Sequence, residues 1–405
     1  MIGLQSCGPI VLSAAASCGR AEESCKENKM DTRFTDEQLA LRDRIAKFAQ
    51  EVLAPEAERI DREGFDMDHY RKVMDAGLVA VPLPKEVGGE GMGTVGRCIL
   101  LEEVSKVCPS TALSYLVGGM SLYYPGASQE LIDKYYMPWV QGKILPAFVF
   151  TEPNAGSDAA AISTVAAEDG DEFVLNGKKH LICNGASADV LNVFAITDPE
   201  EKVSRRLSVF CVPKGTPGVK ATVQPGMSLA GAELAEIEFT DCRIPAGNMI
   251  GERGKGFGMA MSGIAGGRIN AAACAVGIAA HAVEDAVAYV KEREQFGKPI
   301  AANQAVAFTI AKMRRRMESA KALLYKAADM IDRKDPEAAL YTSMAKAEAT
   351  DASVYCADEN LQLHGGIGCL KGCEAERIFR DAHAARIYDG TTNVLDMVIS
   401  RDMLK

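Results

Sequence analysis

The sequence lacks the features that mark several classes of ligand-binding protein. It has no Cys-x-x-Cys pair, and its one short cysteine pair, CLKGC at 369–373, has no second pair to complete a zinc site. No G-x-G-x-x-G motif opens a βαβ unit, so a Rossmann dinucleotide site is not indicated. No apolar run is long enough to cross a bilayer. From the cysteine spacing we expect no metal centre, and from the lack of a long apolar run we expect no membrane partner.

Positive charge is in short supply as well. The 405 residues carry 45 Lys and Arg against 55 Asp and Glu, a formal net charge of -10, which argues against a nucleic-acid partner. The 12 cysteines stand at irregular positions, many in apolar contexts such as VFCVP, where cysteine acts as a small hydrophobe. This pattern favours a reducing compartment, and we expect a cytoplasmic protein.

Residues 1–30 do not share the pattern of the rest of the chain. MIGLQSCGPIVLSAAASCGR has a short apolar centre with no positive residue before it, which makes a poor signal peptide. Glu22, Glu23 and Glu27 argue against a transit peptide. We therefore expect a disordered extension over 1–30, and we favour Met30 as the true start of translation.

The pattern of apolar, polar and turn residues divides the rest of the chain into three units. Over 31–146 helical patterns dominate, beginning with a Thr35–Gln38 capping box and a first helix that Pro55 is expected to end. Over 147–251 short strands follow one another, and DEFVLNGKKHLICNG predicts a β-hairpin that turns at Asn176-Gly177. Over 252–405 long helical patterns at 258–293, 303–332 and 337–363, with the C-terminal segment, predict a four-helix bundle.

The predicted fold class is therefore α+β. It comprises an N-terminal α-helical domain, a middle β-barrel-like domain and a C-terminal four-helix bundle.

The stretch RIYDGTTNV, at 386–394, raises the first functional question. Locally, Asp389-Gly390 is typical of a turn and Thr391 of a helix cap. A carboxylate in an apolar, water-poor setting can equally serve as a general base, because burial raises its pKa. On these nine residues alone, both interpretations stay open.

Four other stretches attract attention, and each has an ordinary structural interpretation beside a functional one. FVFTEPNAGSD (148–158) could be a polar connector, and HLICNG (180–185) a strand with a core cysteine. EREQFGKPI (291–299) could be a helix C-terminus, and QLHGGIG (362–368) a helix end in Gly-Gly. Each signal is weak when taken alone.

In combination the stretches are specific. The order TEPNAGSD, LNGKKHLICNG, EREQFGKPI, QLHGGIG and RDAHAARIYDGT resembles the acyl-CoA dehydrogenase family, over roughly residues 34–403. The resemblance implies the three-part fold described above, bound FAD and an acyl-CoA substrate. It also implies electron-transferring flavoprotein as a partner and a homotetramer or homodimer.

The resemblance gives Asp389 the role of catalytic base, at a position where most family members carry Glu. The base would take the α-proton beside the thioester, and FAD would accept the β-hydrogen as hydride. The positions that match the surroundings of the thioester and pantetheine are Ser157, Arg268, Tyr388 and Gly390.

The resemblance also implies a set of FAD contacts. Arg293, Phe296 and Gln304 would reach the FAD of a neighbouring subunit, and Gln362, Gly365 and Gly366 its pyrophosphate or adenosine part. The other positions that match contacts to FAD are Phe148, Phe150, Thr151, Gly156, Ser157, Leu181, Cys183, Thr391 and Asn393.

The sequence departs from the family pattern at several of these positions. Asp389 is one methylene shorter than Glu, which draws the carboxylate back by roughly 1.5 Å. Gly267 stands where some members place an alternative base, which leaves Asp389 as the candidate. Leu181 replaces a frequent aromatic residue and Cys183 a frequent Thr.

Two further departures concern the substrate. Ala265 stands where an Asp often helps to hold pantetheine, and LAGAELAEIEF lacks the usual Arg-x-Ser pattern. The space left by Gly266 and Gly267 is consistent with a branched, cyclic or aromatic acyl group. The leading hypothesis is therefore a dehydrogenase of short or unusual acyl-CoAs. The alternatives are an enoyl-CoA reductase of the same fold, or a flavin- and acyl-CoA-binding homologue with little turnover.

Overall fold

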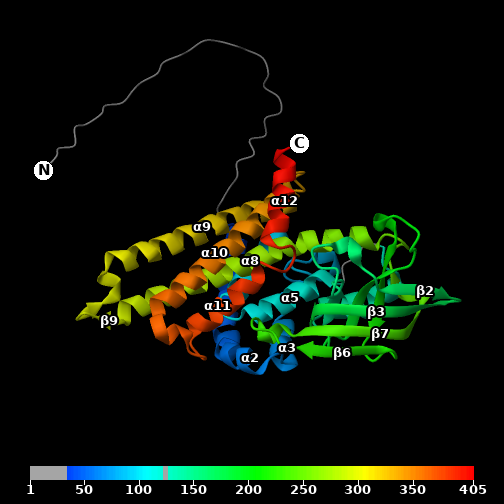
Figure 1. The fold of residues 1–405 in the computed structure, drawn as a ribbon, viewed down its shortest axis with the longest axis horizontal. Helices are drawn as coiled ribbons and strands as arrows, with labels where there is room; N and C mark the ends of the chain where they lie inside the picture. Colours follow the sequence, from blue (N-terminus) through cyan, green and yellow to red (C-terminus); the bar gives the residue numbers. More distant parts are fainter. Residues whose placement is uncertain (1–33, 122–125) are drawn as a thin grey trace, which may run out of the picture. The chain divides into compact units, whose positions relative to one another are not determined.

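The computed structural model describes residues 34–121 and 126–405. The described residues belong to one compact unit that runs from Phe34 to Lys405 (Figure 1). The extension predicted over 1–30 and the start favoured at Met30 lie outside the described residues.

The N-terminal part is helical, as the sequence predicts. Thr35 and Gln38 form the predicted capping box, with Gln38 N donating to Thr35 Oγ1 at 3.2 Å. The α-helices are α1 (Asp36–Phe48), α2 (Ala57–Glu63), α3 (Met67–Asp75), α4 (Gly93–Ser105), α5 (Pro109–Ser121), α6 (Gln129–Leu131) and α7 (Met137–Val140).

The helical path does not end at Pro55, contrary to the prediction. After α1 the chain passes into a π-helical turn (Ala49–Leu53) and a 3-10 turn (Ala54–Glu56), and then into α2. Pro55 lies at the beginning of the 3-10 turn, where its missing N–H leaves no helical hydrogen bond unmade. The proline therefore changes the type of helix instead of ending it.

Eight strands form one sheet in the middle part of the chain. Its order is β6-β7-β3-β2-β4-β5-β8, and β1 pairs with β4 in parallel. The strands are β1 (Pro146–Val149), β2 (Val165–Asp169), β3 (Glu172–Cys183), β4 (Val190–Ile196), β5 (Leu207–Pro213), β6 (Val219–Gln224), β7 (Leu234–Pro245) and β8 (Met249–Ile250).

The hairpin predicted at Asn176-Gly177 is wrong. Both residues lie inside the continuous strand β3, at an irregularity of its pairing with β7, and the real hairpin joins β2 to β3. A Cβ on Gly177 would lie 2.5 Å from Thr164 Oγ1. The glycine is thus required by a close approach of two chain segments, which local sequence cannot reveal.

Strand β4 joins two hydrophobic cores. Leu191, Val193 and Ala195 pack into the core of the sheet domain, whereas Val190 and Phe194 pack into the large core shared with the helices. Successive side chains of a strand point to opposite faces, so a continuous apolar run is buried on both sides. The sheet is thereby fixed against the helical part that carries the site.

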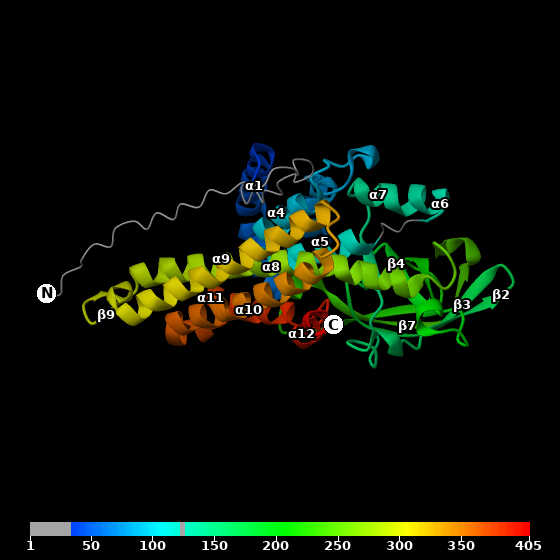
Figure 2. The same cartoon turned by 90° about the horizontal axis from the view of Figure 1, so that it is seen from above.

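The C-terminal part is helical, with three long helices side by side and two shorter ones, the last of which runs across the others (Figures 1 and 2). They are α8 (Gly256–Glu292), α9 (Gln304–Asp332), α10 (Ala338–His364), α11 (Glu374–Ala385) and α12 (Thr392–Met403). A small hairpin of β9 (Glu294–Gln295) and β10 (Lys298–Pro299) joins α8 to α9. In both views this hairpin lies at the end of the molecule opposite to β2 and β3.

Among the described residues, α8 is long and apolar enough to cross a membrane, which corrects the expectation that no such run exists. However, 72% of its most apolar stretch is buried inside the protein. The apolar character of α8 is therefore accounted for by its place in the middle of the helical core.

Candidate active site

Asp389 lies in the short turn between α11 and α12. Its backbone has φ 54°, in the left-handed region, and Gly390 follows with φ 100°. Aspartate tolerates the left-handed conformation better than most residues, and Gly390 needs no Cβ there. Thr391 caps α12 by accepting a hydrogen bond from Val394 N at 3.4 Å. The turn interpretation of the sequence is confirmed, and it leaves room for a chemical role.

Two cationic side chains hold this turn by its backbone. Arg268 on α8 donates from Nε to the carbonyl oxygen of Asp389 at 3.3 Å, and Lys346 on α10 donates from Nζ to that of Gly390 at 2.8 Å. Arg268 also donates from Nη1 to Ser343 Oγ at 3.3 Å. Helices α8 and α10 therefore fix the position of the turn together.

The environment of the Asp389 carboxyl suits proton transfer. Burial raises its pKa from 3.8 to about 6, although Lys346 and then Arg268 act to lower it. A group with this pKa is mostly ionised at neutral pH and remains a useful base. Burial also lowers the pKa of Lys346 to about 8, so the lysine carries its charge at neutral pH.

One wall beside Asp389 is apolar. Tyr388 and Cys183 pack against a small cluster that contains Leu113, Leu229 and Ala232. Burial raises the pKa of the Cys183 thiol to about 12, with Asp389 adding to the effect. Cys183 is therefore a neutral thiol, not a nucleophile.

The loop after β1 is anchored by a buried ion pair. Lys179 on β3 donates from Nζ to Glu152 Oε1 and to Phe150 O, each at 2.9 Å, and Glu152 also accepts from Ser163 and Thr164. Burial by itself would raise the pKa of Glu152, but Lys179 and these hydrogen bonds lower it to about 2. The loop 150–157 is thereby held against β3.

This anchoring leaves the predicted residues of the loop at the surface. Thr151 is half-buried, with its carbonyl accepting from His180 N at 2.9 Å. Gly156 and Ser157 are exposed, and a Cβ on Gly156 would meet nothing within 4 Å. The loop therefore offers polar groups and open backbone, as expected for a ligand edge.

Phe148 and Phe150 form an aromatic cluster with Phe194, at centroid distances of 4.8 and 5.2 Å from it. Phe148 also lies beside α8, because a Cβ on Gly263 would come within 3.5 Å of its ring. One turn further along α8, a Cβ on Gly266 would meet nothing within 4 Å. The predicted free space is confirmed at Gly266, whereas Gly267 is buried.

Strand β3 presents Leu181 outward. The pairing with β7 shifts between Lys179 and Ile182, and Leu181 has φ 54° at this irregularity. Its side chain is 51% exposed, which is unusual for a leucine on a central strand. The bulge thus turns an apolar side chain toward a surface that a flat ligand could cover.

The remaining predicted residues lie elsewhere. Asn393, in the first turn of α12, is exposed near the Asp389 turn. A second group lies at the end of the bundle that carries β9 and β10 (Figure 1). Its members are all exposed and comprise Arg293, Phe296, Gln304, Gln362, Gly365 and Gly366.

Within one chain the structure does not bring these two groups together. Arg268 and Arg293 stand 25 positions apart along α8 and its C-cap, which corresponds to roughly 37 Å. One chain thus carries two separate parts of the expected FAD site.

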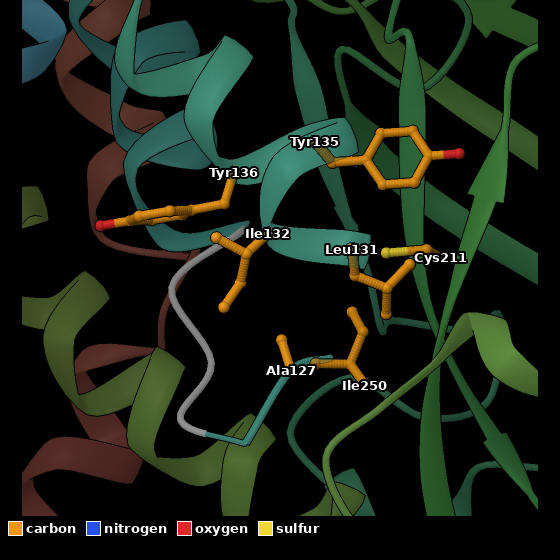
Figure 3. A pocket seen from close by; sticks show the side chains of 7 residues that line it. All are labelled: Ala127, Leu131, Ile132, Tyr135, Tyr136, Cys211 and Ile250. Carbon is orange, nitrogen blue, oxygen red and sulfur yellow. The ribbon is translucent and has the colours of Figure 1, made fainter. Parts of the chain in front are cut away.

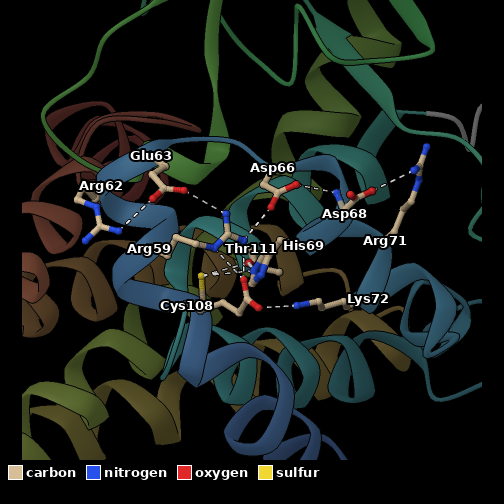
Figure 4. Close-up of polar contacts among 11 residues, drawn as sticks. Arg59, Arg62, Glu63, Asp66, Asp68, His69, Arg71, Lys72, Cys108 and Thr111 are labelled. Carbon is tan, nitrogen blue, oxygen red and sulfur yellow. Dashed lines mark hydrogen bonds and ion pairs between the residues drawn. The ribbon is translucent and has the colours of Figure 1, made fainter.

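Two other features of the molecule lie apart from this chemistry. A small apolar pocket is lined by Ala127, Leu131, Ile132, Tyr135, Tyr136, Cys211 and Ile250 (Figure 3). In the N-terminal part, His69 Nε2 lies 2.6 Å from Thr111 Oγ1 and 3.9 Å from Cys108 Sγ (Figure 4). Burial raises the pKa of Cys108 and lowers that of His69, so both are neutral core groups.

Comparison with known proteins identifies the family. Models of the N-terminal, middle and C-terminal domains of acyl-CoA dehydrogenase match residues 35–143, 147–242 and 254–404. The chain belongs to the acyl-CoA dehydrogenase family. The resemblance seen in the sequence and the predicted three-part fold are thereby confirmed, and the protein is an oxidoreductase.

The relatives include enzymes of both reaction directions. Acryloyl-CoA reductase (NADH) from Anaerotignum propionicum is 40% identical over 385 residues, which cover 93% of this chain and 97% of the relative. Cyclohex-1-ene-1-carbonyl-CoA dehydrogenase from Syntrophus aciditrophicus is 38% identical over 412 residues, covering 98% and 99%.

Solved structures agree with this assignment. Butyryl-CoA dehydrogenase from Megasphaera elsdenii has a TM-score of 0.88 and 34% identity, covering 93% of this chain and 100% of its own. A chain from a structure of the electron transferring flavoprotein of Acidaminococcus fermentans has a TM-score of 0.89 and 36% identity, with the same coverage. An FAD complex of PigA has a TM-score of 0.87 and 29% identity, covering 92% and 99%.

Acyl-CoA dehydrogenases are flavoproteins, and the residues of this chain fit FAD. A Cβ on Gly365 or Gly366 would meet nothing within 4 Å, so backbone at this turn is open to a ligand. The Phe296 ring is 96% exposed, and Leu181 is half exposed. Open glycine backbone suits a pyrophosphate, and exposed apolar or aromatic side chains suit a planar ring.

Sequence reasoning missed three buried charged residues that shape the site. Lys179 and Lys346 are fully buried, and Asp381 on α11 accepts from Leu229 N at 2.7 Å. A signal was present for Lys346, because it is the single charged residue in the run YTSMAKA of small and apolar residues. The partners of all three residues are distant in the sequence, so their roles become visible only in the structure.

Proposed function

We propose that the protein removes the α-proton and the β-hydrogen from a short or cyclic acyl-CoA, giving the 2-enoyl-CoA. The observation that carries this proposal is the Asp389 carboxyl, whose pKa is raised to about 6 by burial, beside Arg268 and Lys346. FAD bound at this site would accept the β-hydrogen as hydride. Asp389 holds the α-proton at its carboxylate, while the apolar wall of Tyr388 and Leu229 excludes water.

The acyl group is proposed from the free space and from the relatives. Asp389 is one methylene shorter than Glu, and Gly266, two residues before Arg268 on α8, leaves open volume. A relative with 38% identity acts on a cyclohexene carbonyl-CoA, and a structural neighbour acts on butyryl-CoA. Both observations favour compact acyl groups over long chains.

A visible spectrum of the purified protein, followed by anaerobic mixing with acyl-CoAs, tests the proposal. The panel contains butyryl-CoA, a branched acyl-CoA, a cyclohexane or cyclohexene carbonyl-CoA and palmitoyl-CoA. We expect a bound flavin that bleaches with a compact acyl-CoA and not with palmitoyl-CoA. A flavin that stays oxidised with every saturated thioester would reject dehydrogenation and leave a binding homologue or a reductase.

Reduction of an enoyl-CoA is the second candidate, supported by the 40% identity to acryloyl-CoA reductase. The two directions need opposite protonation states of Asp389. Dehydrogenation requires the carboxylate, so its rate rises as the pH passes upward through about 6. Reduction requires the protonated acid, so the rate of enoyl-CoA reduction by the reduced protein falls over the same range. Measuring both profiles in one buffer series separates the directions.

We also propose that two or four chains associate, each completing a neighbour's FAD site. The support is the separation between the Asp389 turn and the exposed Arg293, Phe296 and Gln304 at the far end of α8. Light scattering coupled to gel filtration tests this, and a flavin-containing monomer would refute it.

Electron-transferring flavoprotein is the proposed electron partner, supported by the similarity to a chain from such a structure. The cytoplasmic location stays a prediction.

A further inference from the structure

Lys346 is an unusual residue for the middle of a helical bundle. Its side chain is fully buried on α10, yet its ammonium carries a charge at neutral pH because its pKa is lowered only to about 8. A buried charge is strongly unfavourable unless it is paired. Its Nζ lies 2.8 Å from the carbonyl oxygen of Gly390, directly after the proposed base.

We propose that Lys346 is a positioning residue for Asp389. Together with Arg268 it holds the turn 389–390 by two successive carbonyl oxygens, and its charge favours the ionised carboxylate in an apolar site. The inference rests on the proposed function, in which Asp389 is the base, and assigns the lysine a role in it.

The geometry supports a clamp. The two carbonyls that accept from Arg268 and Lys346 belong to consecutive residues, and the two donors come from different helices. Asp389 has positive φ, a conformation that a non-glycine residue keeps only when its surroundings over-determine it. Without the Lys346 donor, the Gly390 carbonyl would lose this hydrogen bond and the turn could relax.

The electrostatics point to the same residue. The titratable groups that face Asp389 come from α8, α10, β3 and its own turn, and they are Arg268, Cys274, Lys346, Cys183 and Tyr388. Burial raises the pKa of Cys274, Cys183 and Tyr388, so these groups are neutral at physiological pH. Among the facing groups, Lys346 and Arg268 carry the charge that opposes the effect of burial on Asp389.

The surroundings of Lys346 contain further charges of both signs. Asp351 raises and Arg386 lowers the pKa of Lys346, and these two residues pair with each other at 3.0 Å. Because their effects on the lysine oppose each other, the pair leaves the Lys346 charge available to Asp389.

The test compares three variants of the full-length holoenzyme. Lys346→Met removes the donor and the charge, and Lys346→Arg keeps the charge. Lys312→Met on the exposed face of α9 removes one charge elsewhere and is the matched control. The measured quantity is the pH at which the rate of flavin bleaching by a reactive acyl-CoA reaches half its plateau.

We expect Lys346→Met to raise this half-plateau pH by about one unit or more, because an opposite charge nearby lowers a carboxyl pKa by such amounts. Lys346→Arg and Lys312→Met should stay within a few tenths of the parent. A loss of rate by the same factor at every pH, with the half-plateau pH unchanged, would show that Lys346 has only a structural role. The same upward shift in Lys346→Arg would also overturn the proposal.

Two further measurements keep the test decisive. If Lys346→Met does not fold, Lys346→Gln keeps a donor near Gly390 and removes only the charge, with the same expected shift. If no acyl-CoA bleaches the parent protein, the proposed function fails by itself. The Asp389 carboxyl can then be titrated by carbon-13 NMR, with Asp389→Asn identifying its signal. A higher pKa in the Lys346 variant supports the coupling, and an unchanged pKa refutes it.

Discussion

Replacing Asp389 by Asn should make the protein inactive and more stable at the same time. The substitution keeps the shape of the side chain but removes its charge and its ability to take a proton. Because a positioned general base contributes about 10² to 10⁴ in rate, we expect a loss of that size in flavin bleaching. The gain in stability follows from the raised pKa of the carboxyl.

The magnitude can be worked from the structure. Burial raises the pKa of Asp389 from 3.8 to about 6, so the folded state binds the proton more tightly than the unfolded state. The free energy of unfolding therefore falls as the pH rises through this window. A difference of about two pH units corresponds to about 3 kcal/mol, which is the upper limit for what ionisation of Asp389 takes from stability at pH 7.

Urea denaturation of the parent and of Asp389→Asn at a series of pH values checks this reasoning. We expect the variant to be more stable by up to about 3 kcal/mol at pH 7, and the advantage to vanish as the pH approaches 4. An Asn variant that is less stable at pH 7, or an advantage that does not depend on pH, would refute a destabilising buried carboxylate. Full bleaching activity in the variant would refute its role as the base.

Other substitutions test the framework around the site. Glu152→Gln leaves the fully buried Lys179 without its carboxylate, and we expect a loss of about 3–5 kcal/mol in urea denaturation together with weaker flavin retention. On α8, Gly277→Ala would place a Cβ 2.0 Å from Ser105 Oγ, so a loss of at least 2 kcal/mol is expected, on the order of other overpacked cores. Gly266→Ala on the same helix meets nothing within 4 Å, so stability should hold or rise by up to about 1 kcal/mol, while steady-state assays show a narrower range of acyl-CoAs.

Much of the fold could be predicted from the sequence, because local rules and tertiary structure agree there. The Thr35 capping box, the three long C-terminal helices and most strands follow from caps, period and turn residues. The failures at Pro55 and Asn176-Gly177 have different causes. Pro55 is exposed and lies at the beginning of a 3-10 turn, where the missing N–H is tolerated. Gly177 lies inside β3, where Thr164 approaches it closely, so only the tertiary structure explains this glycine.

The candidate site was predictable only in part. The motif around Asp389 identified the carboxylate, and its turn conformation followed from Asp-Gly. The raised pKa depends on the burial of Asp389 and on Lys346 and Arg268, which come from helices 43 and 121 positions earlier in the sequence. Spacing along the sequence does not show that Lys346 and Arg268 lie near Asp389, so the raised pKa of Asp389 could be found only from the structure.

The length of α8 has a consequence for experiments on mixed oligomers. If each FAD site takes the Asp389 turn from one chain and the Arg293 end from another, the two chains of a dimer can be impaired independently. Pairing an Asp389→Asn chain with an Arg293→Ala chain would put both defects into one site and leave the other site unaltered. Two inactive preparations, unfolded and reassembled together, would then recover activity in a share of their mixed dimers, as in complementation between alleles of one gene.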